Sequence, residues 1–433
     1  MRQYLLLFLA LCIILPRGAF SLEKMLDPEI GEVGLNLIEL KLAAEGEKPS
    51  AVAHNNLGIA YAAAGKPYEA IAEFEKAHRI TPGDAAVAFN LGVAHAGLKN
   101  YKAALSCLEE AVSLCPDNAA AIFNIGVIHL DMGLTGDAIG DLERALLLSP
   151  AHPLIHYNLA VAYENDKDGL RYGPGFPADK ALEHYRMAID GGLDNVAIRY
   201  NIGIIHSKRG DYGMAVAEFS KACEFDPDFL LARRGLALAL IHQGKYHRAI
   251  RELERSAAAS GDTAASPALA LAYRKLGSFY LENGDYWRAL AQFEKALQHD
   301  RDDAVSHLNT GRIHTVLGNY AEALREIKIA GELDPGLGAA QYLARVYFLK
   351  GVDFENDGDY RLALAEYKKA VDARQDFALA NLVMGELCAD KLGKKEEAVK
   401  YFRRCLELEP EGSYSRQAAE KISALTGSPG AGK

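Results

Sequence analysis

Apolar residues recur along this chain at the spacing of a helix, in paired blocks that follow one another from residue 51 to residue 412. Each pair is about 34 residues long, and Gly with Asn or Asp interrupts it near its middle. The clearest pairs cover residues 51–84, 85–118 and 119–152. The pattern therefore predicts two helices, A and B, joined by a turn and repeated along most of the chain.

The same places in each pair hold the same kinds of residue. Counted from the first residue of a pair, place eight is Gly in eight of ten pairs, place 20 is Ala in all ten, and place 32 is often Pro. Small residues let two helix axes approach closely, and large residues at places seven, 11 and 24 fill the remaining space. Because one pair cannot bury its apolar face, neighbouring pairs are expected to stack.

This order of residues resembles the tetratricopeptide repeat, and in the first pair it is carried by Leu57, Gly58, Tyr61, Ala70, Phe74, Ala77 and Pro82. The resemblance implies an all-α, right-handed superhelical solenoid of about ten helix-turn-helix repeats whose usual role is to bind other proteins. The repeats are expected at residues 51–84, 85–118, 119–152, 153–195, 196–229, 230–263, 270–303, 304–337, 344–377 and 378–412.

Both ends of the array, and three places within it, depart from the repeat. Residues 22–50 are expected to form a helical cap, residues 413–426 a capping helix and residues 427–433 a flexible tail. About nine extra residues lie between the helices of 153–195, which resembles the Sel1-like variant of these repeats. Additions near residues 263–269 and 338–343 are expected to lengthen the joints before the seventh and ninth repeats.

Residues 1–21 read as a secretory signal peptide. A basic residue, Arg2, precedes the apolar run, and Ala19 and Ser21 occupy the small-residue positions of a cleavage site. The protein is therefore expected to be exported, and the absence of an N-x-S/T sequon from the sequence favours a bacterial periplasm. An uncleaved signal anchor and a lipidated Cys12 are the alternatives, and either would bring the protein to a membrane.

The net charge bears on the class of partner, and the cysteines bear on disulfide bonding. The formal charge of −10 argues against general binding of nucleic acid or anionic membrane. Cys388 and Cys405 fall at interior places of the last repeat, where a disulfide bond and buried thiols are both compatible with the sequence.

Motifs that suggest chemistry are incomplete. Residues 427–433 fit the string of a phosphate loop but lack the following helix. Asp166 and Asp168 lack the remaining ligands of a calcium loop. Place 11 is His in four repeats, which are too far apart to share one metal ion; these residues are His95, His129, His206 and His314. We therefore predict no enzyme activity, no cofactor and no metal.

The resemblance also implies that the A helices line a concave face. Place six there is Asn in the first five repeats, and this row resembles the asparagine ladder in the superhelix of O-linked N-acetylglucosamine transferases; it comprises Asn56, Asn90, Asn124, Asn158 and Asn201. Carboxamides can hold the backbone of an extended peptide. Place five carries large rings, Phe89, Phe123, Tyr157 and Tyr200. These rings form either an interaction patch or packing between A helices.

Later repeats place basic residues on the same face. The row comprises Arg234, Arg274, Lys275, Arg312 and Arg345. We expect a two-part groove, amide-rich and apolar first and cationic afterwards, whose second part favours a carboxylate-bearing peptide.

The leading function from sequence is a non-catalytic adaptor of the cell envelope that binds an extended peptide or partner protein in this groove. The alternative is a scaffold subunit of an envelope secretion, assembly or polysaccharide-export complex. A third reading is a carbohydrate- or anion-binding module, whose binding should weaken with salt. Self-association is left open.

Overall fold

The computed structural model describes residues 33–46, 49–165, 169–260 and 265–426, and every regular element in them is a helix. The predicted all-α repeat solenoid is confirmed. The signal segment with Cys12, the residues Asp166 and Asp168, and the tail 427–433 lie outside the described residues.

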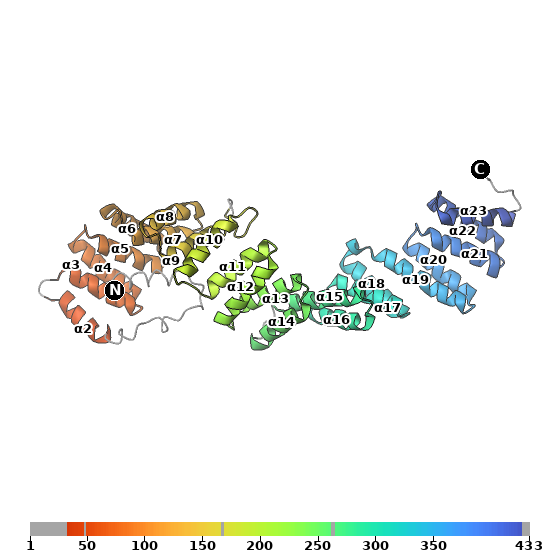
Figure 1. Ribbon diagram of the computed structural model, residues 1–433, viewed down its shortest axis with the longest axis horizontal. Helices are drawn as coiled ribbons and strands as arrows, with labels where there is room; N and C mark the ends of the chain where they lie inside the picture. The colour runs from red at the N-terminus through yellow and green to blue at the C-terminus, as the bar shows by residue number, and fades with distance from the viewer. Residues whose placement is uncertain (1–32, 47–48, 166–168, 261–264, 427–433) are drawn as a thin grey trace. The chain divides into compact units, whose positions relative to one another are not determined.

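The helices fall into two compact units, Met1–Phe225 and Asp226–Lys433. The described helices of the first unit, labelled in Figure 1, are α2 (Val33–Ala44), α3 (Ala51–Ala63), α4 (Pro67–Ile80), α5 (Ala85–Gly97), α6 (Tyr101–Leu114), α7 (Ala119–Asp131), α8 (Thr135–Leu148), α9 (Pro153–Ala162), α10 (Ala178–Asp190), α11 (Val196–Lys208) and α12 (Tyr212–Phe225). The helix α2 lies within the expected N-terminal capping segment 22–50, and five A–B pairs follow it.

The second unit continues the pairs and ends on one further helix. Its described helices are α13 (Leu230–His242), α14 (Tyr246–Ser260), α15 (Ser266–Glu282), α16 (Tyr286–His299), α17 (Ala304–Val316), α18 (Tyr320–Leu333), η4 (Pro335–Leu337), α19 (Ala339–Asn356), α20 (Tyr360–Ala373), α21 (Ala378–Glu386), η5 (Leu387–Lys391), α22 (Lys395–Leu408) and α23 (Ser413–Thr426). The last of these packs against α22 at the expected capping position.

Four A helices begin directly after a capping side chain from the last residue of the preceding repeat. Asp84 accepts hydrogen bonds from Ala86 and Val87, and Asn118, Asn195 and Asp303 bind the backbone of their own next helices. These side chains satisfy backbone N–H groups that have no partner inside the helix. Place 34 therefore acts as a side-chain N-cap where it is Asp or Asn, whereas His152 and Phe229 at this place form no such bond.

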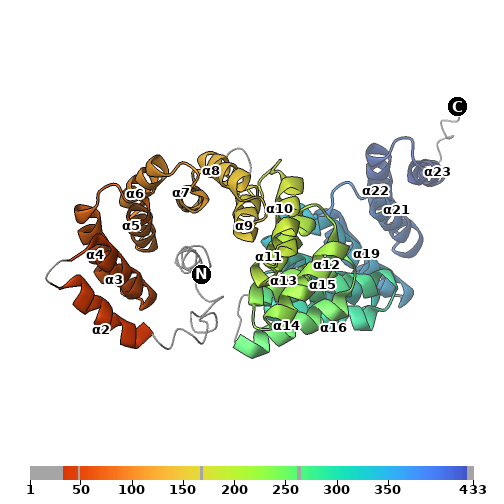
Figure 2. The same cartoon turned by 60° about the vertical axis from the view of Figure 1, so that its left-hand side comes forward.

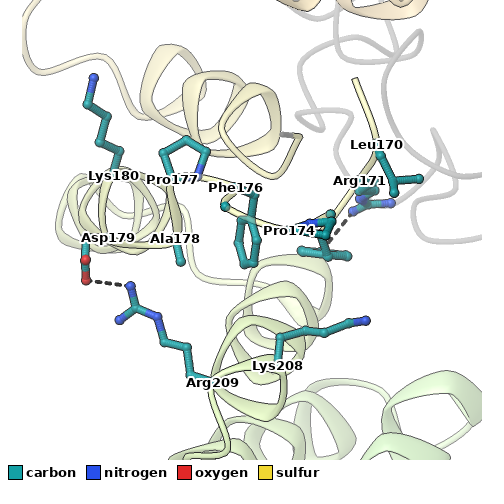
Figure 3. Close-up of a pocket in the computed structure, with 13 residues that line it drawn as sticks. Leu170, Arg171, Pro174, Phe176, Pro177, Ala178, Asp179, Lys180, Lys208 and Arg209 are labelled. Atoms are coloured by element: carbon teal, nitrogen blue, oxygen red, sulfur yellow. Dashed lines mark hydrogen bonds and ion pairs between the residues drawn. The ribbon is translucent and has the colours of Figure 1, made fainter. Parts of the chain in front are cut away.

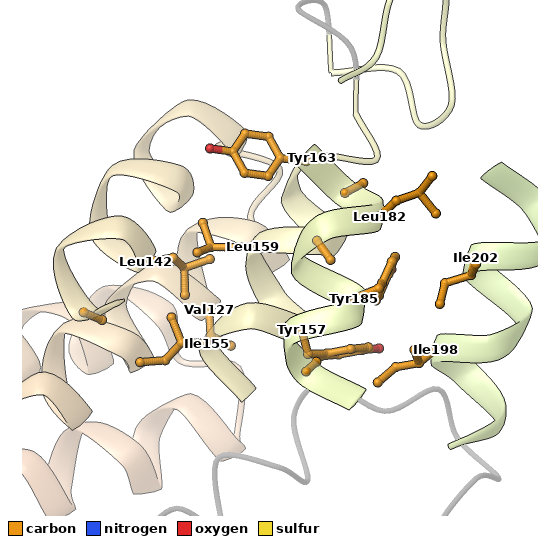
Figure 4. Close-up of a cluster of buried hydrophobic side chains, with 14 of the residues drawn as sticks. Val127, Leu142, Ile155, Tyr157, Leu159, Tyr163, Leu182, Tyr185, Ile198 and Ile202 are labelled. Atoms are coloured by element: carbon orange, nitrogen blue, oxygen red, sulfur yellow. The ribbon is translucent and has the colours of Figure 1, made fainter. Parts of the chain in front are cut away.

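Close packing within a pair follows the predicted pattern. All ten place-20 alanines, from Ala70 to Ala398, are 0% exposed. A methyl group added at Gly58 would lie 2.6 Å from the Phe74 ring, so only glycine fits against place 24 there. In the first unit the core continues between pairs through Tyr157, Tyr185 and Ile198 (Figure 4).

Neighbouring pairs stack through their A helices as well as through A–B contacts. α3 contacts α5, α5 contacts α7, and α7 contacts α9. In Figure 2, α5 and α7 lie on the inner side of the curve that the first unit follows, with α6 and α8 outside them. The A helices of this unit thus line its inner side.

The two short additions enter helices, which corrects the expectation that they lengthen joints. α15 begins at Ser266 and has 17 residues, and α19 begins at Ala339 and has 18, against 13 for α5. The extra residues add about one turn at the start of each A helix. Pro267, near the start of α15, suits a position where the backbone N–H has no helical partner.

In the last repeat Cys388 and Cys405 are free thiols and 0% exposed. Burial raises the pKa of both thiols, which favours the uncharged form. The disulfide alternative is therefore not formed here. Within the described ranges, no helix has both the length and the apolar character needed to cross a membrane.

Candidate functional site

The predicted carboxamide row is largely buried. Asn90, Asn124, Asn158 and Asn201 are at most 6% exposed, while Asn56 is half-buried. The side-chain nitrogens of Asn124 and Asn158 donate to the carbonyl oxygens of Ala120 and Leu154, at 2.7 and 2.8 Å. These two donors are therefore held by their own helices.

Two side-chain oxygens of this row are buried without a hydrogen-bond partner in the described part of the chain. They belong to Asn90, whose nitrogen donates to Asn55 at 2.9 Å, and to Asn158. An unpartnered buried acceptor costs free energy, and a peptide N–H could relieve it. The peptide-binding ladder stays a prediction, but its atoms are less accessible than the sequence suggests.

The aromatic residues beside the row contribute to the interior. Phe89, Phe123 and Tyr157 are at most 8% exposed, and the Phe123 ring lies 6.2 Å from that of His152. Tyr200 is half-buried, with its ring 5.8 Å from Phe219. This burial favours packing over an open interaction patch.

The predicted basic row lies in the second unit, and part of it is exposed. Arg312 and Arg345 are exposed on α17 and α19, and Lys275 is exposed on α15. Arg274 is half-buried and forms an ion pair with Asp303 at 2.9 Å, and Arg234 is half-buried on α13. Because the amide row lies in the first unit and most of the exposed charge in the second, each set is a candidate surface by itself.

Arg312 links two of the predicted features. Its Nη1 donates to the side-chain oxygen of Asn309 at 2.8 Å, and its guanidinium lies over the Tyr342 ring, 5.7 Å from the ring centre. Neither contact neutralises its charge. The side chain is thus oriented and still available to an anion.

A smaller basic pocket lies elsewhere in the second unit. About 380 Å³ in volume, it is lined by residues of α14, of the turn before it and of α15, among them Lys245, Arg248, Arg251 and the half-exposed Phe279. Within the described ranges these three cations form no ion pair, although like charges this close in sequence repel. The clustering is therefore not explained by helix stability.

The repeat pattern did not predict one recurring contact, which joins place four of helix A to place 23 of helix B. Its four examples are His54–Glu73 at 2.7 Å, Arg199–Glu218 at 2.9 Å, Arg233–Glu252 at 3.2 Å and His307–Glu326 at 2.6 Å. A basic residue 19 positions before a Glu is the signal in the sequence. These contacts fix the two helices of a repeat relative to each other.

The insertion between α9 and α10 is held by a buried carboxylate. Glu164 is 0% exposed; its side chain accepts a 2.7 Å hydrogen bond from Arg171 Nε and one of 2.5 Å from the Tyr185 hydroxyl. Burial raises the pKa of Glu164, and the charge of Arg171 opposes that rise. Asn201 joins this network by donating to Tyr185 at 2.8 Å, so one member of the predicted ladder helps to position the insertion.

The insertion forms one wall of a pocket of about 960 Å³, and the end of α11 forms another. Figure 3 shows Phe176 pointing toward α11, with Arg209 on one side and Lys208 on the other. Arg209 forms an ion pair with Asp179 at 2.7 Å. The sequence predicted the insertion but not this pocket, and the likeness to the Sel1-like variant stays a prediction.

The place-11 histidines lie in separate A helices. His129 Nδ1 is 2.7 Å from the Asp141 carboxylate, and His206 is 7% exposed. Burial lowers the pKa of His95. Among the described residues, no three His, Cys, Asp or Glu side chains are grouped to hold a metal ion.

Comparison with solved structures finds other helical repeat proteins. MamA from Desulfovibrio magneticus RS-1 is 23% identical with a TM-score of 0.37, and the match covers 42% of this chain and 98% of that one. PilF from Pseudomonas aeruginosa is 20% identical with a TM-score of 0.42, and the match covers 54% of this chain and 96% of that one. At these identities the likeness concerns the fold alone.

Sequence comparisons find relatives and show which residues match the models of a repeat. DnaJ homolog subfamily C member 3 from Bos taurus and from Homo sapiens is 28% identical over 120 residues, which is 28% of this chain but only 22% of the relative. Models of the tetratricopeptide repeat match residues 49–117, 123–169, 196–229, 228–302, 280–346 and 348–413. With these matches over most of its length and an A–B pair in each expected repeat, the chain belongs to the tetratricopeptide-repeat family.

Proposed function

We propose that this protein is a non-catalytic adaptor that holds an acidic, extended segment of a partner protein against its A helices. Tetratricopeptide repeats generally mediate contacts between proteins, and the matching models indicate no catalytic family. The observation that carries the finer proposal is the exposed basic row on α15, α17 and α19 of the second unit.

The three exposed members of this row carry charge that no ion pair among the described residues neutralises. Lys275, Arg312 and Arg345 form no ion pair in the described part of the chain, and α15, α17 and α19 contact one another in sequence. Carboxylates of a bound segment would relieve the repulsion between these cations and accept hydrogen bonds from the guanidinium groups. The cations gather on successive A helices of a chain whose formal charge is −10, so the charge is local.

Binding of a labelled Asp- and Glu-rich peptide to the full chain, measured by fluorescence anisotropy, tests this proposal. The double variant Arg312→Glu and Arg345→Glu should weaken binding about tenfold or more, since a lost charge-assisted contact is worth about 1.5–3 kcal/mol. The matched control is Lys328→Glu with Arg361→Glu, which reverses two exposed charges on the B helices α18 and α20. Equal loss in both variants, or in neither, would contradict the proposal.

A scaffold subunit that uses the B helices is the second candidate, because a row of large apolar side chains is exposed there. The same place of α4, α6 and α8 carries Ile80, Leu114 and Leu148, which are 47%, 45% and 40% exposed. Exposed apolar rows often mark protein contacts. Capture of partners that survives the arginine reversals but is lost in Leu114→Asp with Leu148→Asp would favour the scaffold.

The location that we propose is the bacterial periplasm, with anchoring by a retained signal segment as the alternative. The support is the sequence of residues 1–21. Cell fractionation of the full chain, with mass spectrometry of the mature N-terminus, tests both. An intact Met1 in the cytoplasmic fraction would overturn the proposal.

An acidic carbohydrate is the third candidate ligand. Whether it binds the basic row is measured by its competition with the labelled peptide.

A further inference from the structure

We propose that the insertion pocket of the first unit is a separate binding site for a peptide segment that carries carboxylates beside an apolar side chain. The site lies between the insertion and the end of α11, and it includes Phe176, Lys208 and Arg209 (Figure 3). It shares no residue with the basic row of the second unit, so it does not rest on the adaptor function proposed above.

The walls of the pocket are built rather than incidental. The repeat needs only a short turn between helices A and B, whereas here Tyr163 to Pro177 separate α9 from α10. Burying a carboxylate such as Glu164 is costly unless it is paired and hydrogen-bonded, and Arg171 and Tyr185 supply those contacts. The network thus holds the described residues 169–177 of the insertion beside the end of α11.

The lining is cationic in a chain that is acidic as a whole. It contains four basic side chains, Arg171, Lys180, Lys208 and Arg209, against one carboxylate, Asp179. Lys208 forms no ion pair in the described residues, and the Lys180 ammonium lies 4.9 Å from the centre of the Tyr163 ring, which carries no formal charge. The charge of Lys208 is thus left to be matched by an anion, whereas Lys180 points away from Lys208 and Arg209 (Figure 3).

The Arg209–Asp179 pair is exchangeable. The Asp179 side chain is 92% exposed and that of Arg209 is 31% exposed, and ion pairs in contact with water contribute little to stability. A ligand carboxylate can therefore replace Asp179 on Arg209. Lys208, on the other side of Phe176, would bind a second carboxylate of the ligand.

The apolar part of the lining selects a peptide over a simple anion. Phe176 packs edge-on against Tyr172, with ring centres 5.6 Å apart, and Pro174 and Pro177 lie beside them. Rings and prolines provide apolar surface without N–H donors. An apolar ligand side chain between two acidic ones matches Phe176 between Arg209 and Lys208.

Anisotropy titrations of the full chain test the proposal in the background of Arg312→Glu with Arg345→Glu, which removes charge from the basic row. The probe is a short labelled peptide of Asp, Glu and Phe, compared with the same peptide carrying Asn and Gln instead. We expect Lys208→Glu to weaken binding of the acidic peptide about tenfold. The matched control Lys102→Glu, an exposed lysine of α6, should change it less than about twofold.

Phe176→Ala separates the two parts of the site. It should weaken binding of the Phe-containing peptide but not of an acidic peptide with Ala in place of Phe. Equal binding of the amide peptide, or equal effects of Lys208→Glu and Lys102→Glu, would overturn the proposal. Displacement of the peptide by inorganic phosphate alone, with no effect of Phe176→Ala, would also overturn it. If the basic row of the parent protein does not bind an acidic peptide, these results can still be interpreted, because they compare variants of the first unit only.

Discussion

Asn158 is fully buried in α9, where its side-chain nitrogen donates to the carbonyl oxygen of Leu154 at 2.8 Å. Replacement by Ala removes this hydrogen bond and leaves a small cavity. We expect Asn158→Ala to lower the free energy of unfolding by about 1–3 kcal/mol. The measurement is the urea midpoint followed by circular dichroism.

Asn56 is the matched control for this prediction. It occupies the same place in the first repeat but is only half-buried, and no side-chain hydrogen bond of its own is found in the described residues. Asn56→Ala should therefore cost less than half as much as Asn158→Ala. A cost as large at Asn56 would show that the row is structural throughout, whatever its burial.

The pairing of residues could be predicted from sequence only where the repeat itself enforces it. Gly58 against Phe74 follows from the pattern because every repeat needs close helices. The hydrogen bond of Asn201 does not follow from the pattern. Its partner Tyr185 belongs to the preceding repeat and bonds to Glu164, which also binds Arg171 of the insertion in that repeat. Side-chain burial at place six likewise depends on neighbouring repeats, which a single-repeat pattern does not describe.

At the scale of the helix pair, place eight decides how closely A and B approach. A methyl group at Gly203 would lie 2.7 Å from the Phe219 ring, whereas one at Gly140, within α8, would meet nothing within 4 Å. Gly203→Ala should destabilise the protein by about 1–3 kcal/mol through overpacking. Gly140→Ala should stabilise it by about 0.5–1 kcal/mol, because glycine weakens an exposed helix. Thermal unfolding of both variants gives the sign, and two changes of the same sign would contradict this account.

The contacts between places four and 23 make pairing of the helices depend on pH. Burial alone would raise the pKa of Glu73, but its hydrogen bonds to Lys76 and His54 outweigh burial and lower the pKa. A lowered carboxyl pKa stabilises the fold above the ordinary Glu pKa of about 4.3, and this stability is lost as the pH falls through the lowered value.

Glu73→Gln should therefore destabilise the protein at neutral pH and change its stability less below about pH 4. Urea midpoints from neutral to acid pH measure this difference. Glu75→Gln, which alters an exposed carboxylate of the same helix α4, is the control and should leave the pH profile close to that of the parent. A parent profile reproduced by Glu73→Gln would contradict the role assigned to these contacts.

At the scale of the whole chain, most of the fold was predictable because one local pattern is repeated ten times. The same small set of residue types predicts the helix pair in each repeat, so a wrong prediction for one repeat does not change the predicted architecture. The surfaces were less predictable. The insertion pocket is lined by Phe176 of one repeat and Arg209 of the next, and no single repeat contains both. The longer α15 and α19 show the same limit, since extra residues can extend a helix or a joint.

Contacts between neighbours also decide how far a local defect spreads. In a stacked array each repeat is stabilised by the repeats beside it, so destabilising one repeat should loosen its neighbours and leave distant repeats unchanged. Gly58→Ala places a methyl group 2.6 Å from the Phe74 ring in the first repeat. Hydrogen exchange read by mass spectrometry should become faster in α3 to α6 and stay unchanged in α17 to α20 of the second unit. Gly140→Ala serves as the control, with no acceleration in either region. Faster exchange in α17 to α20 of Gly58→Ala would show that the array unfolds as one block, and the two compact units would then share their stability.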